Sequence, residues 1–383
     1  MKTIGIICEY NPFHLGHARH IELSRAAAGG DCAVICAMSG NITQRGELAV
    51  FNKHARAEAA VRCGADLVLE LPAAVTLASA EHFAHGAVQL LNALGVCDEM
   101  SFGSECGDLA RLERVAETLT SDECDELTRS ALATGLPYAE SRQRALNALS
   151  PDASLLRSPN NLLAVHYVIA LRALNSAITP RTVRREGDIS ASAVRELLRR
   201  NDPSALEYVP AAARPVFDRE LAAGRAAIHS HAEVAILSRL RVSSPEAFAQ
   251  LPDGGDGLAE RLARFAPTAA TLDELTERVK TKRHAMSRVK RAILCAAIGI
   301  TAEDAATPPP TARVLAMNGT GRALLREIAH KSELPIVTKP SAAKEHLRLE
   351  SAATDLFVFG YAEAKDRAGG VEWTTSPVVV PDV

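Results

Sequence analysis

The first hundred residues alternate between short apolar runs and longer segments with helical periodicity. The apolar runs with the length of buried strands are residues 2–10, 32–38, 65–72 and 99–105. The helical patterns that stand between them are residues 14–28, 52–64 and 79–95. Short buried strands that alternate with helices predict a parallel sheet with helices on both faces. The ligand crevice of such a sheet lies at the carboxyl ends of its strands.

Beyond residue 107 the pattern is mostly helical. One more short strand is expected at 178–188, followed by a helix at 190–200, and we place the end of the first domain at residue 205. The segment 206–383 is mainly helical, with breaks at clusters of proline and glycine. The expected architecture is therefore an α/β domain with a parallel sheet over residues 1–205, followed by a mainly α-helical domain over 206–383.

The composition is that of an ordinary globular protein. Of the 383 residues 47% are hydrophobic, and a formal net charge of −3 gives no bulk attraction to nucleic acid. The absence of a signal-peptide pattern and of a long apolar stretch predicts a cytoplasmic protein that does not enter a membrane. The eight cysteines include no Cys-x-x-Cys pair, which favours free thiols over disulfides or zinc ligands, so no metal site in the protein is expected.

The turn after the first expected strand carries two histidines. His14 and His17 are spaced as His-x-Gly-His at the start of a helix, so both fall on one face of that helix. A helix start offers unpaired N–H groups and a partial positive charge, and two imidazoles add further donors for phosphate oxygens. Gly16 has no side chain and lets another group come close to the backbone. The alternative is a pair of surface histidines at an ordinary helix start.

A second expected helix start carries serines and an arginine. Residues 189–195 read ISASAVR, with serines at the N-cap and Arg195 one turn into the helix. Hydroxyl groups, free N–H groups and a guanidinium would converge there, although simple capping with a solvated arginine explains the same residues. His-x-Gly-His after the first strand, combined with this motif after the last, resembles the paired signature of the HIGH-superfamily nucleotidylyltransferases. That resemblance implies a Rossmann-like (HUP) fold.

Further motifs narrow the resemblance. Several segments follow the order of one family: EYNPFHLGH, MSGNITQRGELAVFNKHARAEAAVRCGADLVLELP, SAEHFAHGAVQLLNALG, FGSE, SPNN and TKRHAMSRVKRAIL. Together they resemble the bacterial tRNA(Met) cytidine acetate ligase family. The matching motifs are dense over residues 1–105 and recur at 158–200 and 280–295, so they span most of the chain.

The resemblance implies an ATP-dependent ligase that works in two steps. Acetate attacks the α-phosphorus of ATP, which gives acetyl-adenylate and pyrophosphate. The exocyclic amine of the wobble cytidine in elongator tRNA(Met) then takes the acetyl group, and the product is N4-acetylcytidine. Neither step needs a nucleophilic side chain, because both depend on positioning and on stabilising charge at phosphate oxygens. Mg²⁺ is expected with the triphosphate.

The same resemblance implies roles for individual residues. His14 and His17 would contact the phosphates as the catalytic pair, and Gly103 would let adenosine lie against the backbone. Asn160 or Asn161 could supply an amide to ATP, although Pro-Asn-Asn is also an ordinary helix-entry turn. The full set expected to bind ATP is Ile7, Cys8, Glu9, Tyr10, Asn11, Pro12, Phe13, His14, Leu15, Gly16, His17, His20, Gly103, Asn160, Asn161, Arg185, Ser190 and Arg195.

The loop after the second expected strand holds candidates for acetate or the cytidine. It reads SGNITQRGE, and an arginine such as Arg45 fits a carboxylate, while amide or carboxylate groups can read a cytosine edge. We therefore expect Arg45 and Lys53 to hold acetate or the cytidine. A surface loop without a ligand is the alternative.

One segment departs from the overall charge. Residues 278–291 hold seven basic residues and no acidic one. Because a phosphate backbone selects such local asymmetry, we expect Lys282, Arg283, Arg288 and Lys290 to contact tRNA, and a solvated basic helix is the alternative. The segment has no Phe, Trp or Tyr, so base stacking is not expected from it.

Two other function classes are compatible with these motifs. A nucleotidylyltransferase that joins AMP to a small phosphorylated metabolite would share the first domain, but it would not need a long second domain with a basic segment. A non-catalytic RNA-binding protein that retained the fold would be favoured by loss of a motif histidine, and both histidines are present. The sequence carries no signal for an oligomeric state.

Overall fold

The structure is a computed structural model that describes residues 1–185, 191–200 and 202–382. Within these residues eight strands form one sheet in the order β5-β4-β1-β2-β3-β6-β7, with β8 paired to β6. The strands are β1 (Lys2–Cys8), β2 (Cys32–Ser39), β3 (Leu67–Leu71), β4 (Glu99–Ser104), β5 (Thr179–Arg184), β6 (Ala312–Met317), β7 (Ile336–Val337) and β8 (Val378–Val379). Strands β1 to β5 are mutually parallel, which confirms the expected Rossmann-like α/β sheet.

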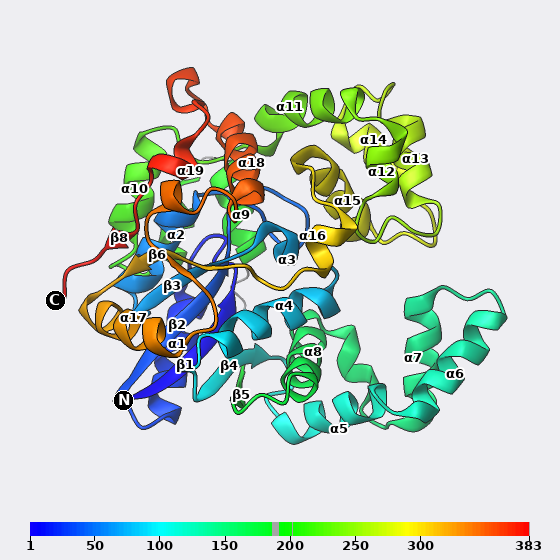
Figure 1. Ribbon diagram of the computed structural model, residues 1–383, viewed down its shortest axis with the longest axis horizontal. Coiled ribbons are helices and arrows are strands. Elements are labelled where there is room, and N and C mark those ends of the chain that lie inside the picture. The colour runs from blue at the N-terminus through cyan, green and yellow to red at the C-terminus, as the bar shows by residue number, and fades with distance from the viewer. Residues whose placement is uncertain (186–190, 201, 383) are drawn as a thin grey trace.

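Helices cover both faces of this sheet (Figure 1). The first group is α1 (Leu15–Ala27), α2 (Lys53–Arg62), α3 (Ala73–Thr76), α4 (Ala80–Ala93), α5 (Leu109–Leu119), α6 (Asp122–Ala133), α7 (Tyr138–Leu149), α8 (Pro159–Ala173) and α9 (Ala191–Arg199). The second group is α10 (Arg214–Ala222), α11 (His229–Val242), α12 (Pro245–Ala249), α13 (Leu258–Phe265), α14 (Leu272–Val279), α15 (Met286–Ile298), α16 (Ala302–Ala306), α17 (Gly319–Lys331), α18 (Arg348–Phe357) and α19 (Val371–Thr374). Among the described residues, no helix combines the length and apolarity needed to cross a bilayer.

The sequence of β2 explains why both faces of the sheet are covered. All of its residues are buried, and alternate side chains enter different apolar clusters. Ile35 and Ala37 share a cluster with residues of α4, α5 and α8, whereas Cys36 and Met38 share one with residues of α1, α2 and α10. A strand buried on both faces is therefore a continuous apolar run, as the sequence of β2 is.

The chain beyond residue 205 contributes to the sheet as well as to the helices. Strands β6, β7 and β8 extend the sheet at its β3 edge, with β6 antiparallel to β3. These strands were not expected, and the domain boundary at residue 205 stays a prediction. Helices α11 to α15 form the helical part at the upper right of Figure 1 and share a separate apolar core with α3 and α18.

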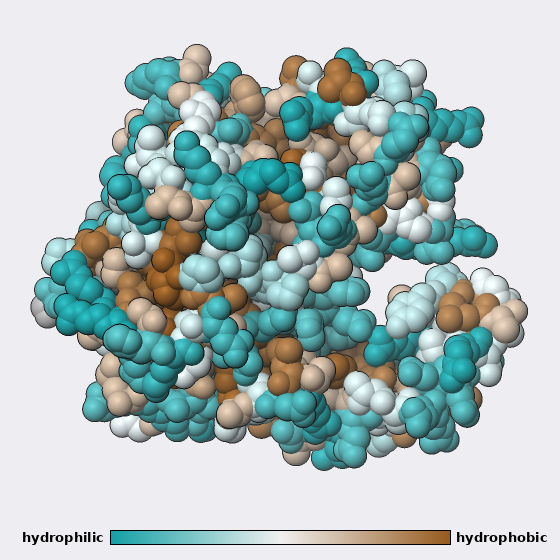
Figure 2. Space-filling view, in the orientation of Figure 1, coloured by the Kyte–Doolittle hydropathy of each residue, from teal (hydrophilic) through white to brown (hydrophobic). Residues whose placement is uncertain are grey.

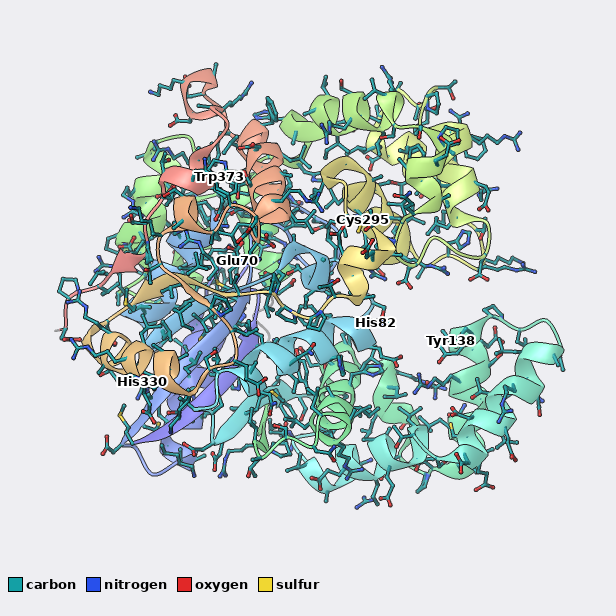
Figure 3. The ribbon with its side chains drawn as sticks, in the orientation of Figure 1. Glu70, His82, Tyr138, Cys295, His330 and Trp373 are labelled. Atoms are coloured by element: carbon teal, nitrogen blue, oxygen red, sulfur yellow. The ribbon has the colours of Figure 1, made fainter. Side chains whose placement is uncertain are left out.

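A helical arm projects from the body after β4. Figure 1 shows α6 and α7 side by side and away from the sheet, and Figure 2 shows a notch between this arm and the C-terminal helices. Figure 3 labels Tyr138 at the start of α7, where 56% of its surface is exposed. The arm therefore presents helical surface on the side of the notch opposite to α12–α14.

A cluster of buried charges joins the C-terminal segment to the sheet. Lys53 Nζ lies 2.7 Å from a carboxylate oxygen of Glu70 on β3 and 2.6 Å from one of Glu372 on α19. Arg313 Nε on β6 lies 3.5 Å from the other oxygen of Glu372. Although burial alone would raise the pKa of Glu372, the two cations hold it at about 2. Each charge is thus compensated by neighbours rather than by water.

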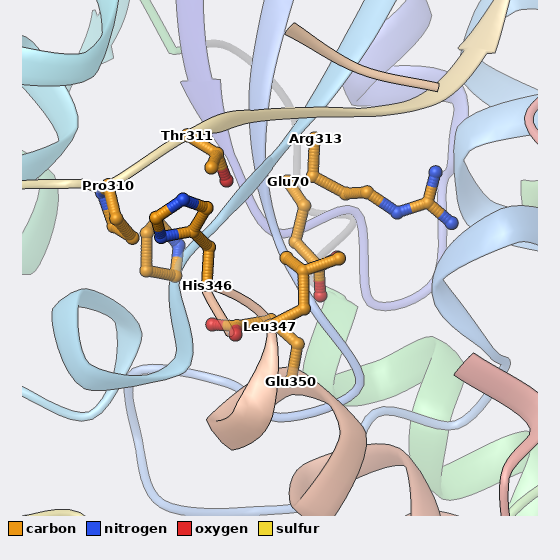
Figure 4. A pocket seen from close by; sticks show the side chains of 8 residues that line it. Glu70, Pro310, Thr311, Arg313, His346, Leu347 and Glu350 are labelled. Atoms are coloured by element: carbon orange, nitrogen blue, oxygen red, sulfur yellow. The ribbon is translucent and has the colours of Figure 1, made fainter. Parts of the chain in front are cut away.

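The space beside this cluster is small. Figure 4 shows Glu70, Arg313 and Glu350 around a cavity of about 10 Å³, which is at the lower limit for one water molecule. Glu350 of α18 accepts a hydrogen bond from the Ala73 N–H at 2.9 Å, so α18 also caps the start of α3. The cavity is therefore a packing gap of the charged cluster rather than a ligand site.

Replacing Glu372 with Gln is expected to lower the free energy of unfolding by about 3–5 kcal/mol, because Lys53 and Arg313 would lose a buried partner. Urea denaturation would measure the change. Glu327→Gln is the matched control, since Glu327 pairs with Lys331 on the surface of α17, and its loss should cost about 0.5 kcal/mol or less. Equal effects of the two changes would contradict the role of the cluster.

Candidate active site

A cavity of about 750 Å³ opens at the carboxyl ends of β1 and β4. In the sheet, β2 lies on one side of β1 and β4 lies on the other, so the strand order reverses at β1. A parallel sheet opens a crevice for ligands at such a point. Its walls come from the β1–α1 turn, the end of β4, the loop 43–47 and the helices α4, α8, α9 and α15. The volume is in the range of nucleotide-sized pockets.

Most residues expected to bind ATP line this cavity: Ile7, Cys8, Glu9, Tyr10, Asn11, His14, His17, His20, Gly103, Asn160, Arg185 and Arg195. Others lie beside it instead: Pro12, Phe13, Leu15, Gly16 and Asn161. Phe13 is fully buried in the apolar cluster under the turn, and Leu15 is 42% exposed on the outer side of α1. Ser190 lies outside the described residues. The structure thus brings residues from five separate segments to one wall.

The two motif histidines cap the start of α1 with their own rings. His14 Nδ1 accepts a hydrogen bond from the Gly16 N–H at 3.0 Å, and His17 Nδ1 accepts one from the His14 N–H at 3.3 Å. The rings stack with centroids 3.8 Å apart. Because Nδ1 of each ring is an acceptor, the remaining proton of each neutral ring is on Nε2. Both histidines therefore hold an Nε2–H donor at the cavity wall.

Burial keeps these rings uncharged. It lowers the pKa of His14 to about 4, with a further contribution from the Arg185 and Arg195 charges, and it lowers the pKa of His17 well below its usual value. His20 has a pKa of about 4 for the same reason, and its Nε2 lies 3.1 Å from Ser101 Oγ. At neutral pH the histidines of this wall are therefore dipolar donors, and arginines carry the positive charge.

Gly16 leaves room for the first histidine of its own motif. A Cβ atom at this position would lie 2.9 Å from Cε1 of His14, so a side chain would collide with the ring that caps the helix. The group that approaches the backbone at Gly16 is thus the first histidine of the motif itself. The glycine therefore permits the geometry of the histidines, and the approach of a ligand to its backbone stays a prediction.

The β4 side of the cavity holds Gly103, Asn160 and Arg185. A Cβ at Gly103 would lie 3.1 Å from Cγ of Arg185, so the missing side chain leaves room for the arginine. Asn160 Nδ2 donates to Glu105 Oε1 at 2.7 Å, and Asn160 Oδ1 accepts from Arg185 at 3.5 Å. Asn161 accepts instead from the N–H groups that follow β4, and it is 2% exposed. Of the two asparagines, Asn160 is therefore the one available to a ligand.

Arg195 links the last motif to the first. Its Nη1 donates to the Asn11 carbonyl at 2.8 Å, and its Nη2 donates to Ser192 Oγ at 2.9 Å. Its Nε is buried and has no hydrogen-bond partner among the described residues. The guanidinium is thus fixed at the cavity, and its buried Nε–H is left without a partner among the described residues.

The loop 43–47 joins this wall to the C-terminal helices. The Gln44 N–H donates to Glu9 Oε1 at 2.6 Å, and Glu47 pairs with Lys290 of α15 at 2.7 Å. Gly46 has φ of +76°, and a Cβ there would lie 2.6 Å from the Arg291 backbone nitrogen, so the loop lies directly against α15. Arg45 is exposed at the cavity wall, where its expected contact with acetate or the cytidine stays a prediction.

The expectation for Lys53 is wrong. Lys53 is 1% exposed, does not line the cavity, and has its ammonium between Glu70 and Glu372. A buried lysine held by two carboxylates cannot turn to a ligand without leaving Glu70 unpaired and Glu372 with Arg313 alone.

The basic segment is not one continuous helix. It spans the end of α14, a connection at 280–285 and the start of α15. Lys282 and Arg283 are exposed, whereas Arg288 donates to the Asp253 carbonyl at 2.8 Å and pairs with Asp256. Lys290 lines the cavity and pairs with Glu47. The four expected tRNA contacts therefore fall into two free surface cations and two cations that already hold loops.

Several wall residues were not assigned a role from the sequence, although most of them lie within the quoted motifs: Thr43, Ala80, Phe83, Phe102, Glu105, Leu162, Leu163, Tyr167, Met286 and Ser287. Most are apolar, and apolar residues in helices and strands have the pattern of ordinary core. The position of Phe102 and Glu105 at the carboxyl end of a parallel strand is a signal that could have pointed to them.

This fold and site define a nucleotidyl transferase, with two histidines and two arginines where the parallel sheet reverses its order. A family model described as HIGH Nucleotidyl Transferase matches residues 1–370. The chain is 35% identical to the tRNA(Met) cytidine acetate ligase of Acetivibrio thermocellus, over 99% of this chain and 100% of the relative. It is 33% identical to that of Clostridium perfringens, over 99% and 100%. The chain therefore belongs to the tRNA(Met) cytidine acetate ligase family, which confirms the resemblance of the motifs.

A solved structure agrees with this assignment. The crystal structure of Thermotoga maritima TmcAL bound with alpha-thio ATP matches with a TM-score of 0.94 and 30% sequence identity. The match covers 100% of both chains.

Replacing Gly16 with Ala is expected to displace the His14 ring and break its hydrogen bond from the residue 16 N–H. ¹⁵N NMR of histidine-labelled protein would show this as a change from the pure Nε2–H tautomer of His14. Gly255→Ala is the control, because a Cβ at that position meets no atom within 4 Å. Identical His14 signals in the wild type and the Gly16 variant would contradict the cap.

Proposed function

We propose that this protein is an ATP-dependent ligase that uses acetate to acetylate the wobble cytidine of elongator tRNA(Met), forming N4-acetylcytidine. The observation that carries the proposal is one cavity with two different walls. One wall holds neutral histidine donors and two arginines, and the other holds the loop 43–47 and the start of α15 with its basic segment. Membership of the ligase family gives the reaction class. A tRNA substrate would place the reaction in the cytoplasm.

The first step would use the wall with the histidines. An acetate oxygen forms a bond to the α-phosphorus of ATP, and the bond to the bridging oxygen of pyrophosphate breaks. Donors from His14 and His17, with the charges of Arg185 and Arg195, would stabilise the negative charge that develops on the phosphate oxygens. Asn160 would add a side-chain amide. Arg45 on the opposite wall would fit the carboxylate of acetate.

Mg²⁺ would accompany the triphosphate in this step. The described residues contain no group of three or more His, Cys, Asp or Glu that could hold a metal ion. The described residues therefore do not fit a metal ion that is held by protein ligands alone. Mg²⁺ commonly binds through substrate phosphates and water instead. The ion would therefore arrive with its nucleotide and add positive charge at the phosphates.

The second step would need the C-terminal surface. A tRNA is a large polyanion, and Lys282 and Arg283 offer free positive charge close to the α15 wall of the cavity. A nucleotidylyltransferase for a small phosphorylated metabolite would have no use for these cations. A scaffold without catalysis would have no use for buried, uncharged histidines held with their donors at the cavity.

The acyl source tests the proposal directly. Acetate and ATP are expected to acetylate tRNA with release of AMP and pyrophosphate, whereas acetyl-coenzyme A without ATP should give no product. Exchange of labelled pyrophosphate into ATP in the presence of acetate would detect the first step separately. Product formation from acetyl-coenzyme A alone, or exchange that does not depend on acetate, would contradict the ligase function.

The tRNA contact is tested most sharply at the two free cations. Reversing the charge of Lys282 and Arg283 is expected to weaken tRNA binding and to flatten its salt dependence, because each lost phosphate contact removes the release of roughly one counterion. Arg288 and Lys290 are left intact, since they hold the 253–256 loop and Glu47.

A matched control reverses the charge of Arg322 and Arg326, which are exposed on α17 at the other side of the molecule (Figure 1). This control should leave the salt slope of tRNA binding unchanged. Acetate-dependent pyrophosphate exchange should survive both double variants. An unchanged salt slope in the Lys282 and Arg283 variant would mean that this segment is a solvated basic surface that does not contact tRNA.

A further inference from the structure

Transfer of the acetyl group leaves one proton without an assigned acceptor. On the proposed function, the N4 amine of the cytidine attacks the acetyl carbonyl and must lose a proton before the amide is complete. General bases that take such a proton contribute about 10²–10⁴-fold to a rate. The groups that line the cavity can be compared for this role by their hydrogen bonds and charges.

The histidines do not fit the role of a base. The Nδ1 atoms of His14 and His17 already accept backbone N–H groups, and their Nε2 atoms carry the protons. His20 has its Nε2 next to Ser101 Oγ. Burial lowers the pKa of all three rings, so none would hold a proton well near neutral pH. During acetyl transfer these rings therefore donate hydrogen bonds or take no part.

Two of the three carboxylates on the described cavity wall are already occupied. Glu47 is paired with Lys290, and although burial alone would raise its pKa, the ammonium holds that pKa below its usual value. Glu105 accepts hydrogen bonds from Asn160 and Asn161 at both oxygens, which outweigh burial and likewise lower its pKa. Each therefore resists taking a proton.

Glu9 differs from both. It follows β1 and faces the cavity, and its Oε1 is fixed by the Gln44 N–H at 2.6 Å. Its Oε2 accepts no hydrogen bond from the described residues. Burial raises the pKa of Glu9 against the opposing effects of that N–H group and of nearby arginines. One oxygen is thus held in place while the other is available at the wall shared with the loop 43–47.

We propose that Glu9 is the catalytic base that accepts the N4 proton of the cytidine during acetyl transfer. The N4 nitrogen forms the bond to the acetyl carbon, and the bond from that carbon to the phosphate oxygen breaks. AMP leaves with the electron pair, and the N4 proton goes to Glu9 Oε2 and then to water. The place of Glu9 between the histidine wall and the loop 43–47 puts the cytosine on the loop side of the acetyl-adenylate.

The surroundings of Glu9 set the direction of the pH dependence. Arg45, Arg56 and Arg195 approach it from the loop, α2 and α9, and each favours the charged carboxylate. Cys8 and Tyr167 are neutral neighbours, because burial raises the pKa of both. Glu9 must be ionised to accept a proton, so transfer should speed up as the pH rises through its raised pKa and then level off.

The test separates the two steps in one variant. Glu9→Gln keeps an oxygen for the Gln44 N–H but cannot accept a proton. Acetyl transfer from preformed enzyme-bound acetyl-adenylate to tRNA, followed in a single turnover across about pH 5 to 8, is expected to fall by about 10²-fold or more and to lose its pH dependence. Acetate-dependent pyrophosphate exchange needs no proton acceptor, so its rate should fall much less than the rate of transfer and should keep the pH dependence of the wild type.

Controls make each outcome decisive. Glu47→Gln, a carboxylate of the same wall, should retain the pH dependence of transfer, and Glu9→Asp should recover part of the rate. Unchanged transfer in Glu9→Gln, or parallel loss of transfer and exchange, would overturn the role of Glu9. Wild-type protein that shows no acetate-dependent exchange would instead contradict the proposed function itself.

Discussion

The buried pairing of Lys53 with Glu70 and Glu372 is the constraint on which the rest of the molecule depends. These charges cannot be solvated in place, so β3, α2 and α19 must come together for any of them to be stable. Thr354 of α18 donates to Glu372 and accepts from Asn41, whose own oxygen accepts the Lys53 N–H. The position of the loop that begins at residue 40 is therefore set by contacts made more than three hundred residues later in the chain.

The cavity also depends on contacts between distant parts of the chain. The cap formed by His14 and His17 is built locally, from a turn and the first residues of α1, whereas Asn160, Arg185 and Arg195 reach the same cavity from later segments of the chain. The loop 43–47 and α15 line the same cavity and are joined by the pair of Glu47 and Lys290, so this part of the lining depends on the C-terminal helices. Residues from the first and the last third of the chain thus line one space.

These differences explain what the sequence could and could not predict. Strands β1 to β5 and the helix start at His14 depend on local periodicity and on residue types with strict geometric preferences, and these were predicted correctly. The capping of that helix by the rings of His14 and His17 was not predicted. Strands β7 and β8 have two residues each, and β6 is an apolar run in a helical context, so no local pattern marks them. Lys53 looks like a surface cation because its two carboxylate partners are distant in the sequence. Long-range pairing, rather than propensity, decides such cases.

The uncharged state of the motif histidines has a consequence for turnover. In the proposed reaction, pyrophosphate must leave before the enzyme can be used again. A ring that presents an N–H dipole holds a product phosphate less tightly than a cation in the same place would, because hydrogen bonds between charged partners are the stronger kind. With only the arginines charged, the site stabilises the charge that appears during bond breaking without binding the leaving group too tightly. Neutral imidazoles would thus serve release as much as bond making.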